Sequence, residues 1–293
     1  MTARPGDGAH VEPNAGLRPR RSEYYDMSAD EVFRRYWGWY RRIRALYLAL
    51  SALIGLAAIV SFVLGSVLLY AVGLAAIVAL ALVLQTKINR RFVRLVAILD
   101  TDCDVQKWRS VINLLRTHLR RKRSLRTCKL YLAVADFEEC RPADALARMA
   151  GLRISAWNPQ AVSLHQGRAV NANELGDTAT RDAELAALRE LCSRGLPAAR
   201  AIARDQVESL ELIFRPRDSW GEKDLALIEA HLAKAASHRE CVSWELHLAE
   251  YHLLHGDAVA AAQLLGEGRL APMTPRARRR RDELARQLRR LAG

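Results

Sequence analysis

Histidine, cysteine and acidic side chains lie closest together in the stretch HRECVSWELHLAEYHLLHGD, residues 238–257. His238 and Cys241 are three residues apart, as are His252 and His255, so each pair would share one face of a helix. Two such pairs form the donor set of a zinc site. On one continuous helix, however, the two pairs are separated by up to ~25 Å, and each alone supplies half of a tetrahedral site. We therefore interpret them as ordinary helix residues and expect no metal ligands.

Other catalytic patterns are missing from the sequence. It contains no Gly-rich phosphate loop, no G-x-S-x-G elbow and no dinucleotide-binding fingerprint. The five cysteines are odd in number and widely spaced, without a C-x-x-C pair, which favours reduced thiols in a cytosolic domain over a disulfide framework. We therefore expect no catalytic residues, no cofactor and no enzyme activity.

Basic side chains are densest in RTHLRRKRSLRTCK, residues 116–129, which hold seven basic residues and no acid. At its centre are Arg120, Arg121, Lys122 and Arg123. We predict that these four contact anionic lipid, because each basic residue near such a surface contributes about 1 kcal/mol. A solvated helix end is the alternative that the sequence leaves open.

The net charge of +13 is distributed unevenly along the chain. Residues 86–129 carry 13 positive and 3 negative groups, whereas residues 130–269 carry 15 positive and 21 negative groups. A nucleic-acid-binding protein usually spreads basic residues over its folded face. The layout therefore disfavours nucleic acid as a partner and favours the surface of a lipid bilayer.

An uncharged block of forty residues, 45–84, explains why a membrane is expected. A helix of about 20 residues crosses a hydrocarbon core of ~30 Å, so the block is long enough for two crossings. Leu64, Gly65 and Ser66 supply a turn near its middle. We predict a transmembrane hairpin with spans at about 43–63 and 67–86, inside a unit that covers residues 28–87.

The residues that flank the hairpin predict its orientation. The turn is uncharged, whereas basic residues precede and follow the block: Arg34, Arg35, Arg41, Arg42, Arg44, Lys87, Arg90, Arg91 and Arg94. By the positive-inside rule, both termini are expected in the cytoplasm. The 39 Arg against 6 Lys are typical of a GC-rich bacterial genome, so we expect a multi-pass protein of the cell (inner) membrane.

Aromatic residues cluster just before the first span, in the sequence YWGWY. We predict that Tyr36, Trp37, Trp39 and Tyr40 are membrane-interface anchors, since Trp and Tyr prefer headgroup depth. Residues 28–31 have the spacing of a capping box, so an amphipathic helix is expected to run from there into the first span.

The remainder of the chain predicts an all-α fold. Residues 1–27, with scattered Pro and Gly, are expected to be a disordered cytoplasmic tail. From residue 88 onward Ala, Leu, Arg and Glu dominate, and breakers recur at helix-length intervals. Asp104 and Asp257 stand where helix N-caps are needed. We expect juxtamembrane basic helices over 88–124 and a helical-repeat domain over 125–293, whose last helix caps the array or, alternatively, touches the membrane.

Two stretches of this helical part match each other: LYLAVADFEECRPADALARM, residues 130–149, and LHLAEYHLLHGDAVAAAQLL, residues 246–265. Aligned identical pairs are Leu130 and Leu246, Leu132 and Leu248, Ala133 and Ala249, and Ala145 and Ala261. The offset of 116 residues leaves room for three units of about 36–40 residues. This pattern resembles the tetratricopeptide repeat (TPR) over about 125–270. Residues 98–108, ILDTDCDVQKW, also resemble an element of uncharacterised bacterial membrane proteins with two spans and such repeats.

The resemblance implies a TPR-like α-solenoid whose concave groove binds a protein or peptide partner and performs no chemistry. Val134 and Glu250 stand where members that clamp a C-terminal carboxylate have Asn, so another ligand is expected. The sequence thus predicts a membrane-anchored cytoplasmic interaction scaffold. A membrane-shaping hairpin protein whose helical domain forms homo-oligomers is the alternative left open.

Overall fold

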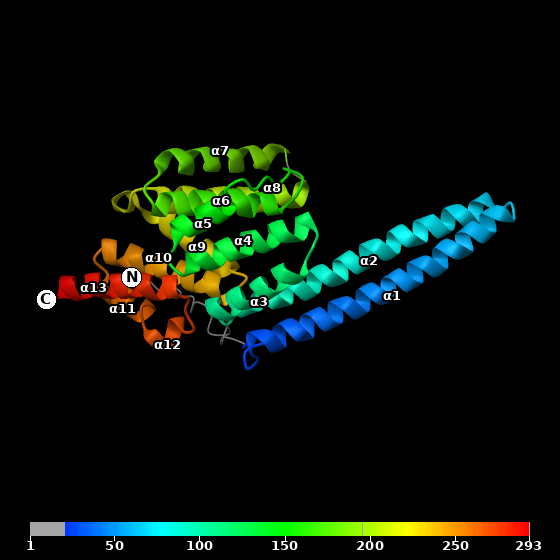
Figure 1. Ribbon diagram of the computed structural model, residues 1–293. Coiled ribbons are helices and arrows are strands. Elements are labelled where there is room, and N and C mark those ends of the chain that lie inside the picture. Colours follow the sequence, from blue (N-terminus) through cyan, green and yellow to red (C-terminus); the bar gives the residue numbers. More distant parts are fainter. Residues whose placement is uncertain (1–20, 195, 293) are drawn as a thin grey trace, which may run out of the picture.

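The computed structural model describes residues 21–194 and 196–292, and every regular element among them is helical. The expected all-α class is confirmed for this part of the chain. Two long helices project from a body that the other helices form (Figure 1). The elements are α1 (Ala29–Val63), α2 (Val67–Asp100), α3 (Val105–His118), α4 (Lys122–Glu138), α5 (Pro142–Met149), α6 (Gln160–Glu174), α7 (Thr178–Arg194), α8 (Pro197–Phe214), η1 (Arg217–Ser219), α9 (Glu222–Lys234), α10 (His238–Leu254), α11 (Ala258–Leu264), α12 (Glu267–Leu270) and α13 (Pro275–Ala292).

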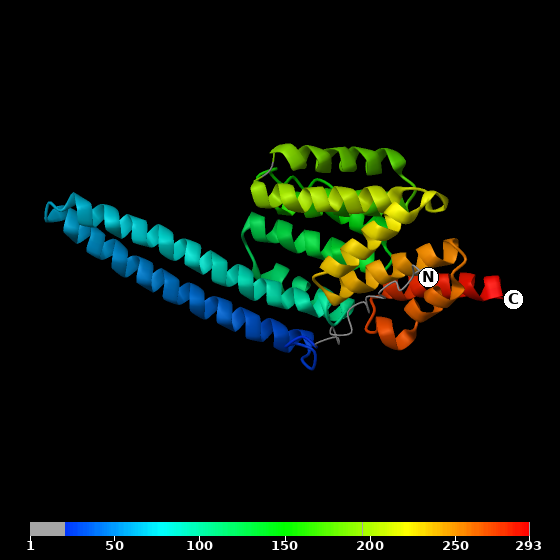
Figure 2. The same cartoon turned by 180° about the vertical axis from the view of Figure 1, so that it is seen from behind.

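Helices α1 and α2 lie side by side as an antiparallel hairpin (Figures 1 and 2). The turn falls at residues 64–66, as predicted, and Gly65 adopts φ +82°, a left-handed conformation that glycine takes without steric cost. Both helices are long and apolar enough to cross a membrane by length and composition. In the most apolar 18-residue segment of each helix, 6% of the residues are buried in α1 and 0% in α2.

Both hairpin helices extend well beyond the uncharged block. The capping box of Ser28 and Glu31 starts α1 at Ala29, with both of its hydrogen bonds formed. Helix α2 continues to Asp100, past the expected unit boundary at residue 87, because no Gly or Pro interrupts residues 74–100. At 1.5 Å per residue each helix is ~50 Å long, which exceeds the ~30 Å thickness of a hydrocarbon core by about 20 Å.

The basal ends of the hairpin share a hydrophobic core with α3 and α4. Leu95 and Ile98 of α2 are fully buried against Trp108 and Ile112 of α3. Burying each such side chain contributes about 1.5–3 kcal/mol, so the base of the hairpin is packed into the body rather than flexibly linked to it.

A short segment before α1 is also packed, which moves the expected end of the N-terminal tail. The Ser22 backbone N–H donates to Asp102 Oδ1 at 2.8 Å, and Tyr24 is fully buried in the core of the hairpin base. The ordered chain therefore includes residues 22–27, contrary to the tail expected to extend to 27. The rest of that tail, residues 1–20, lies outside the described residues.

The body consists of two stacks that meet at the base of the hairpin. Helices α3 to α8 form the first stack, with α8 packed on α6 and α7 (Figure 1). Helix α9 packs mainly on α10, and α10, α11 and α13 form a second stack with their own core. Helices α10 and α13 then return to contact α2 and α4. Helix α4 begins at Lys122 and α10 at His238, 116 residues apart.

One close approach holds the two hairpin helices together. A Cβ atom added to Gly73 of α2 would lie 2.6 Å from Cβ of Ala58 in α1, whereas one added to Gly55 would meet its nearest neighbour, Ile77 Cδ1, at 3.9 Å. Small residues at such crossings allow membrane helices to pack closely.

Gly73→Ala is therefore expected to force the two helices apart and to weaken their pairing by roughly 1–3 kcal/mol, as overpacking does. Gly55→Ala is the matched control, because the same substitution there meets only ordinary contact. Spin labels at residues 46 and 83 would report the interhelical distance in detergent micelles. An unchanged distance in the Gly73 variant would contradict the proposed crossing.

Candidate membrane-contact site

The four predicted aromatic anchors do not all face the same environment. Trp37, Trp39 and Tyr40 are partly exposed, and the rings of Trp37 and Tyr40 stack with centroids 5.2 Å apart. Trp37 also lies against His118 at the end of α3, at 5.4 Å. These three side chains remain available for contact with headgroups.

Tyr36 is a core residue, which corrects its assignment as a surface anchor. It is 6% exposed and packs with Phe92 of α2, at a centroid distance of 6.4 Å, in the core of the hairpin base. The reason is helical spacing: Val32 and Tyr36 are four residues apart and share the face of α1 that turns toward α3. The amphipathic helix was expected from that pattern, but its protein partner was not.

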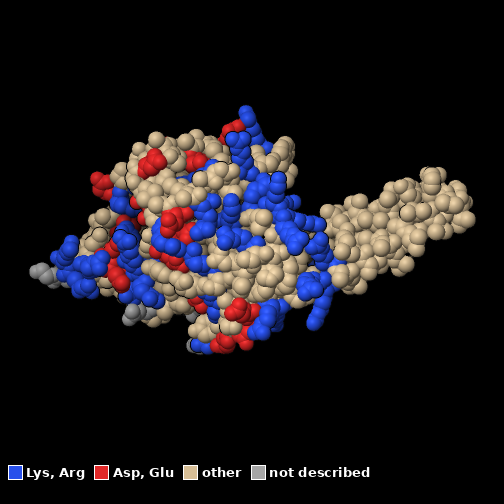
Figure 3. All heavy atoms as spheres, viewed as in Figure 1, with Lys and Arg blue, Asp and Glu red and all other residues tan. Residues whose placement is uncertain are grey.

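The predicted lipid-contact residues lie in the turn after α3 and at the start of α4. Helix α3 ends at His118 and α4 begins at Lys122, so Arg120 and Arg121 occupy the turn and Arg123 belongs to the first turn of α4. All four basic side chains are exposed. Figure 3 shows Lys and Arg gathered beside the base of the uncharged hairpin, and also at the opposite end of the body.

A loop that sequence reasoning did not single out lies beside this basic turn. Residues 150–159 join α5 to α6, and the Arg126 Nη1 group of α4 donates to the backbone oxygen of Arg153 at 3.0 Å. The side chain of Trp157 in this loop is 66% exposed. The sequence around a single Trp does not indicate which residues it will contact. The packing of α4 against α6 brings Trp157 next to the basic residues.

The histidine and cysteine residues of α10 serve packing. His238 Nε2 lies 2.8 Å from the backbone oxygen of Pro272, and the His255 ring stacks on Tyr251 with centroids 4.0 Å apart. His252 Nδ1 lies 3.5 Å from Asp257. The continuous helix expected for this stretch is observed as α10, with His255 as its C-cap residue.

A different acid–histidine group joins the two stacks. His231 of α9 is 4% exposed and stacks on Trp244 with ring centroids 4.5 Å apart. Asp205 of α8 approaches its Nδ1 and Glu208 approaches its Nε2, each at 3.8 Å. One ligand atom from each of Asp205, Glu208 and His231 lies within 4.8 Å of the others, so the group has the donors for a metal ion. The Ser209 hydroxyl of α8 also lies 3.2 Å from His231 Nε2, so the histidine ring contacts α8 without an ion.

Glu250, which stands at the position of the clamp Asn in the family pattern, is enclosed by the protein itself. Its carboxylate pairs with Arg280 of α13 and with Arg217, the latter at 3.3 Å. Burial acts to raise its pKa, but His247, whose Nδ1 lies 3.7 Å from Oε2, and the charges of Arg280 and Arg217 outweigh burial and lower the pKa to about 2. Helix α13 therefore covers this position.

Comparison with protein-family models, with characterised proteins and with solved structures finds no match for this chain. Its function has to be inferred from its own residues.

Proposed function

We propose that the protein is a membrane-anchored scaffold of the cell inner membrane, whose hairpin inserts into the bilayer and whose helical body recruits a protein partner on the cytoplasmic side. The observation that carries this proposal is the surface of the hairpin. Large apolar side chains there are solvent-exposed along both helices, including Leu53 at 64% and Leu68 at 75%. A soluble protein rarely exposes contiguous apolar patches above a few hundred Å².

The way in which the hairpin joins the body supports the anchoring role. Because the basal ends of α1 and α2 are packed into the core with α3, insertion of the hairpin would fix the orientation of the body relative to the bilayer. The basic turn and the exposed aromatic residues then lie on the membrane side. Stacked helices without a predicted catalytic motif suit recruitment of a protein, as in helical-repeat families.

The membrane topology can be tested in intact cells with an impermeant maleimide. Ser66→Cys is expected to be labelled from outside, because the proposed topology places the hairpin turn on that side of the membrane. The substitution should not disturb the turn, since Ser66 makes no side-chain capping bond. The natural cysteines are expected to stay unlabelled because they lie in the cytoplasmic body. Burial also raises the pKa of Cys103 to about 12 and that of Cys128 to about 11, which makes both poor nucleophiles.

Ser193→Cys is the matched control, because this exposed position at the end of α7 belongs to the body. It should react only after the cells are permeabilised. Labelling of the Ser193 variant from outside, without labelling at position 66, would overturn the proposed orientation.

The scaffold proposal is separable from the membrane-shaping alternative by crosslinking the full chain in cells. A scaffold is expected to give a crosslinked species that contains a second kind of chain. Crosslinks only between copies of this chain, with a homo-oligomeric mass in detergent, would favour the alternative.

A further inference from the structure

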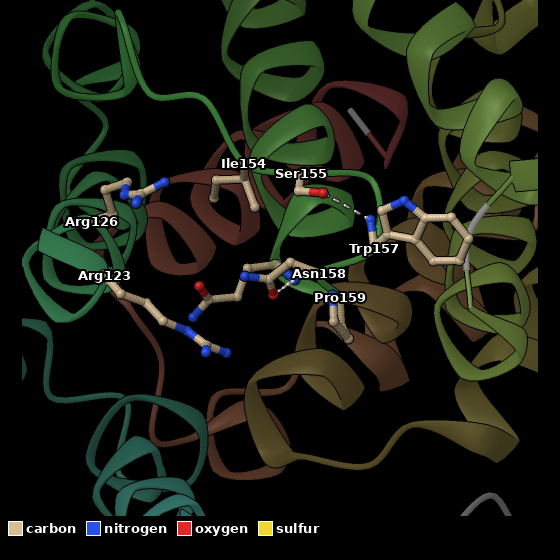
Figure 4. A pocket seen from close by; sticks show the side chains of 8 residues that line it. Arg123, Arg126, Ile154, Ser155, Trp157, Asn158 and Pro159 are labelled. Atoms are coloured by element: carbon tan, nitrogen blue, oxygen red, sulfur yellow. Dashed lines mark hydrogen bonds between the residues drawn. The ribbon is translucent and has the colours of Figure 1, made fainter.

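The start of α4 and the loop between α5 and α6 line an open cavity of about 340 Å³. Its lining residues are Arg123, Arg126, Ile154, Ser155, Trp157, Asn158, Pro159 and Gln160. Figure 4 shows Arg123 and Arg126 extending from α4 on one side of the cavity and the loop residues on the other. The volume falls at the lower end of the range for small-molecule sites, ~300–1,000 Å³, which suits a small polar group.

The wall of the cavity is held in place by contacts between α4 and α6. Thr127 and Gln160 are hydrogen-bonded through their side chains, with Gln160 Nε2 donating to Thr127 Oγ1 at 3.0 Å. Arg126 donates to the backbone oxygen of Arg153 at 3.0 Å, which fixes one edge of the loop. The cavity is therefore built from two helices and a tethered loop.

The electrostatics of the lining favour an anion. Arg123 and Arg126 contribute two positive charges, and the lining contains no carboxylate. Within the residues that the structure describes, neither guanidinium pairs with an acid, and Arg126 spends one N–H on a backbone carbonyl. The N-terminal end of α6 at Gln160 also borders the cavity, and a helix N-terminus adds partial positive charge.

Hydrogen-bond donors complete the lining. The Ser155 hydroxyl oxygen accepts from the Trp157 backbone N–H at 3.4 Å, and Asn158 Oδ1 accepts from the Gln160 backbone N–H at 3.0 Å. These bonds use the acceptors, so the hydroxyl proton of Ser155 and the amide protons of Asn158 are left to donate. Two guanidinium groups with neutral donors are the chemistry that recognises a phosphate.

The rim identifies the source of that phosphate. Trp157 lines the cavity yet is 66% exposed, so a large amphipathic ring stands at its edge. Arg123, in the first turn of α4, is exposed and directly follows Arg120, Arg121 and Lys122, so the cavity adjoins these basic residues. Trp beside Arg is the combination that sits at a headgroup layer.

We propose that this cavity binds the phosphate of an anionic phospholipid, with Arg123 and Arg126 on the phosphate oxygens and Trp157 among the neighbouring headgroups. The proposal rests on the proposed function, since it requires the hairpin to place the body at a bilayer. It extends that function, because the helical body would then bind anionic lipids in preference to neutral ones.

Native mass spectrometry of the full chain in detergent tests the proposal. The probes are phosphatidylglycerol, phosphatidylcholine and inorganic phosphate. Phosphatidylglycerol is expected to bind more tightly than phosphatidylcholine, and the double variant Arg123→Ala/Arg126→Ala is expected to lose that affinity by about tenfold or more. The matched control is Arg204→Ala/Arg278→Ala, which removes the same charge from exposed positions outside the cavity.

Three outcomes would overturn the assignment. Equal loss in the control variant would mean that binding reflects net charge alone, and no loss in the Arg123/Arg126 variant would place the lipid elsewhere. Inorganic phosphate binding as tightly as the lipid, with Trp157→Ala without effect on either, would make the cavity a site for a soluble phosphate. Failure of the proposed function is seen separately, as the wrong labelling pattern at position 66.

Discussion

Replacing Asp136 with alanine is expected to lower the free energy of unfolding of the helical body by about 3–5 kcal/mol. The Asp136 side chain is fully buried in α4, where Arg109 of α3 and Arg141 approach it at 2.8 Å and Arg148 of α5 at 2.6 Å. One carboxylate thus joins three consecutive helices. Its removal takes the carboxylate partner from Arg148 and leaves Arg109 and Arg141 with Glu139, which is the costly way to break a buried ion pair.

Asp144→Ala provides the control for this prediction. Asp144 pairs with Arg141 at 3.5 Å, but its side chain is 58% exposed, so its loss is expected to change stability by less than about 1 kcal/mol. Urea unfolding of the full chain in mild detergent, followed by tryptophan fluorescence, measures both variants. A change of less than 1 kcal/mol for Asp136→Ala would show that water solvates the three arginines and that the network holds little of the fold.

Local signals in the sequence identified much of the fold. The uncharged block and Gly65 predicted the hairpin and its turn, because both depend on composition over a few residues. Three predicted capping residues are observed to accept backbone hydrogen bonds at helix starts: Ser28, Asp104 and Asp257. Such signals are readable because each residue acts on neighbours three positions away.

Contacts between distant residues were not readable in the same way. The face of α1 that carries Tyr36 was assigned to the headgroup layer, because an apolar stripe looks the same whether lipid or protein covers it. In the structure Tyr36 packs with Phe92 and Tyr24, so this face of α1 is covered by protein. The candidate lipid site shows the same limit. The basic residues were evident from the sequence, but the loop that completes the cavity was not, because Arg153, which Arg126 contacts, lies 27 residues further along the chain.

One such distant contact lies where the second stack meets the hairpin. Arg239 of α10 donates to Asp100 at the end of α2, at 2.9 Å, and to Glu138 of α4, at 2.7 Å. Thr274, just before α13, donates to the other oxygen of Glu138 at 2.8 Å. Glu138 is 5% exposed, so its charge depends on these partners. A single guanidinium therefore joins the hairpin to both stacks.

Arg239→Ala is expected to destabilise the full chain by about 2–3 kcal/mol and to loosen the second stack from the hairpin. The figure lies below that for Asp136 because the Arg239 side chain is 32% exposed, so water screens part of the interaction. Amide hydrogen exchange in detergent should then become faster in α10, in α13 and at the end of α2, because the contact that holds these helices together is lost.

Arg269→Ala is the control, because it removes an ion pair that does not involve the hairpin. Arg269 of α12 has a similar exposure, 34%, and pairs with Glu245 of α10 at 2.9 Å, so neither residue belongs to the hairpin. Its loss should leave exchange at the end of α2 unchanged. If the two variants exchange alike, the second stack is held at the hairpin by apolar packing, and the body keeps its orientation without Arg239. If only Arg239→Ala releases α2, the hairpin and the second stack are coupled through this one side chain, and a partner bound to that stack would act on the hairpin.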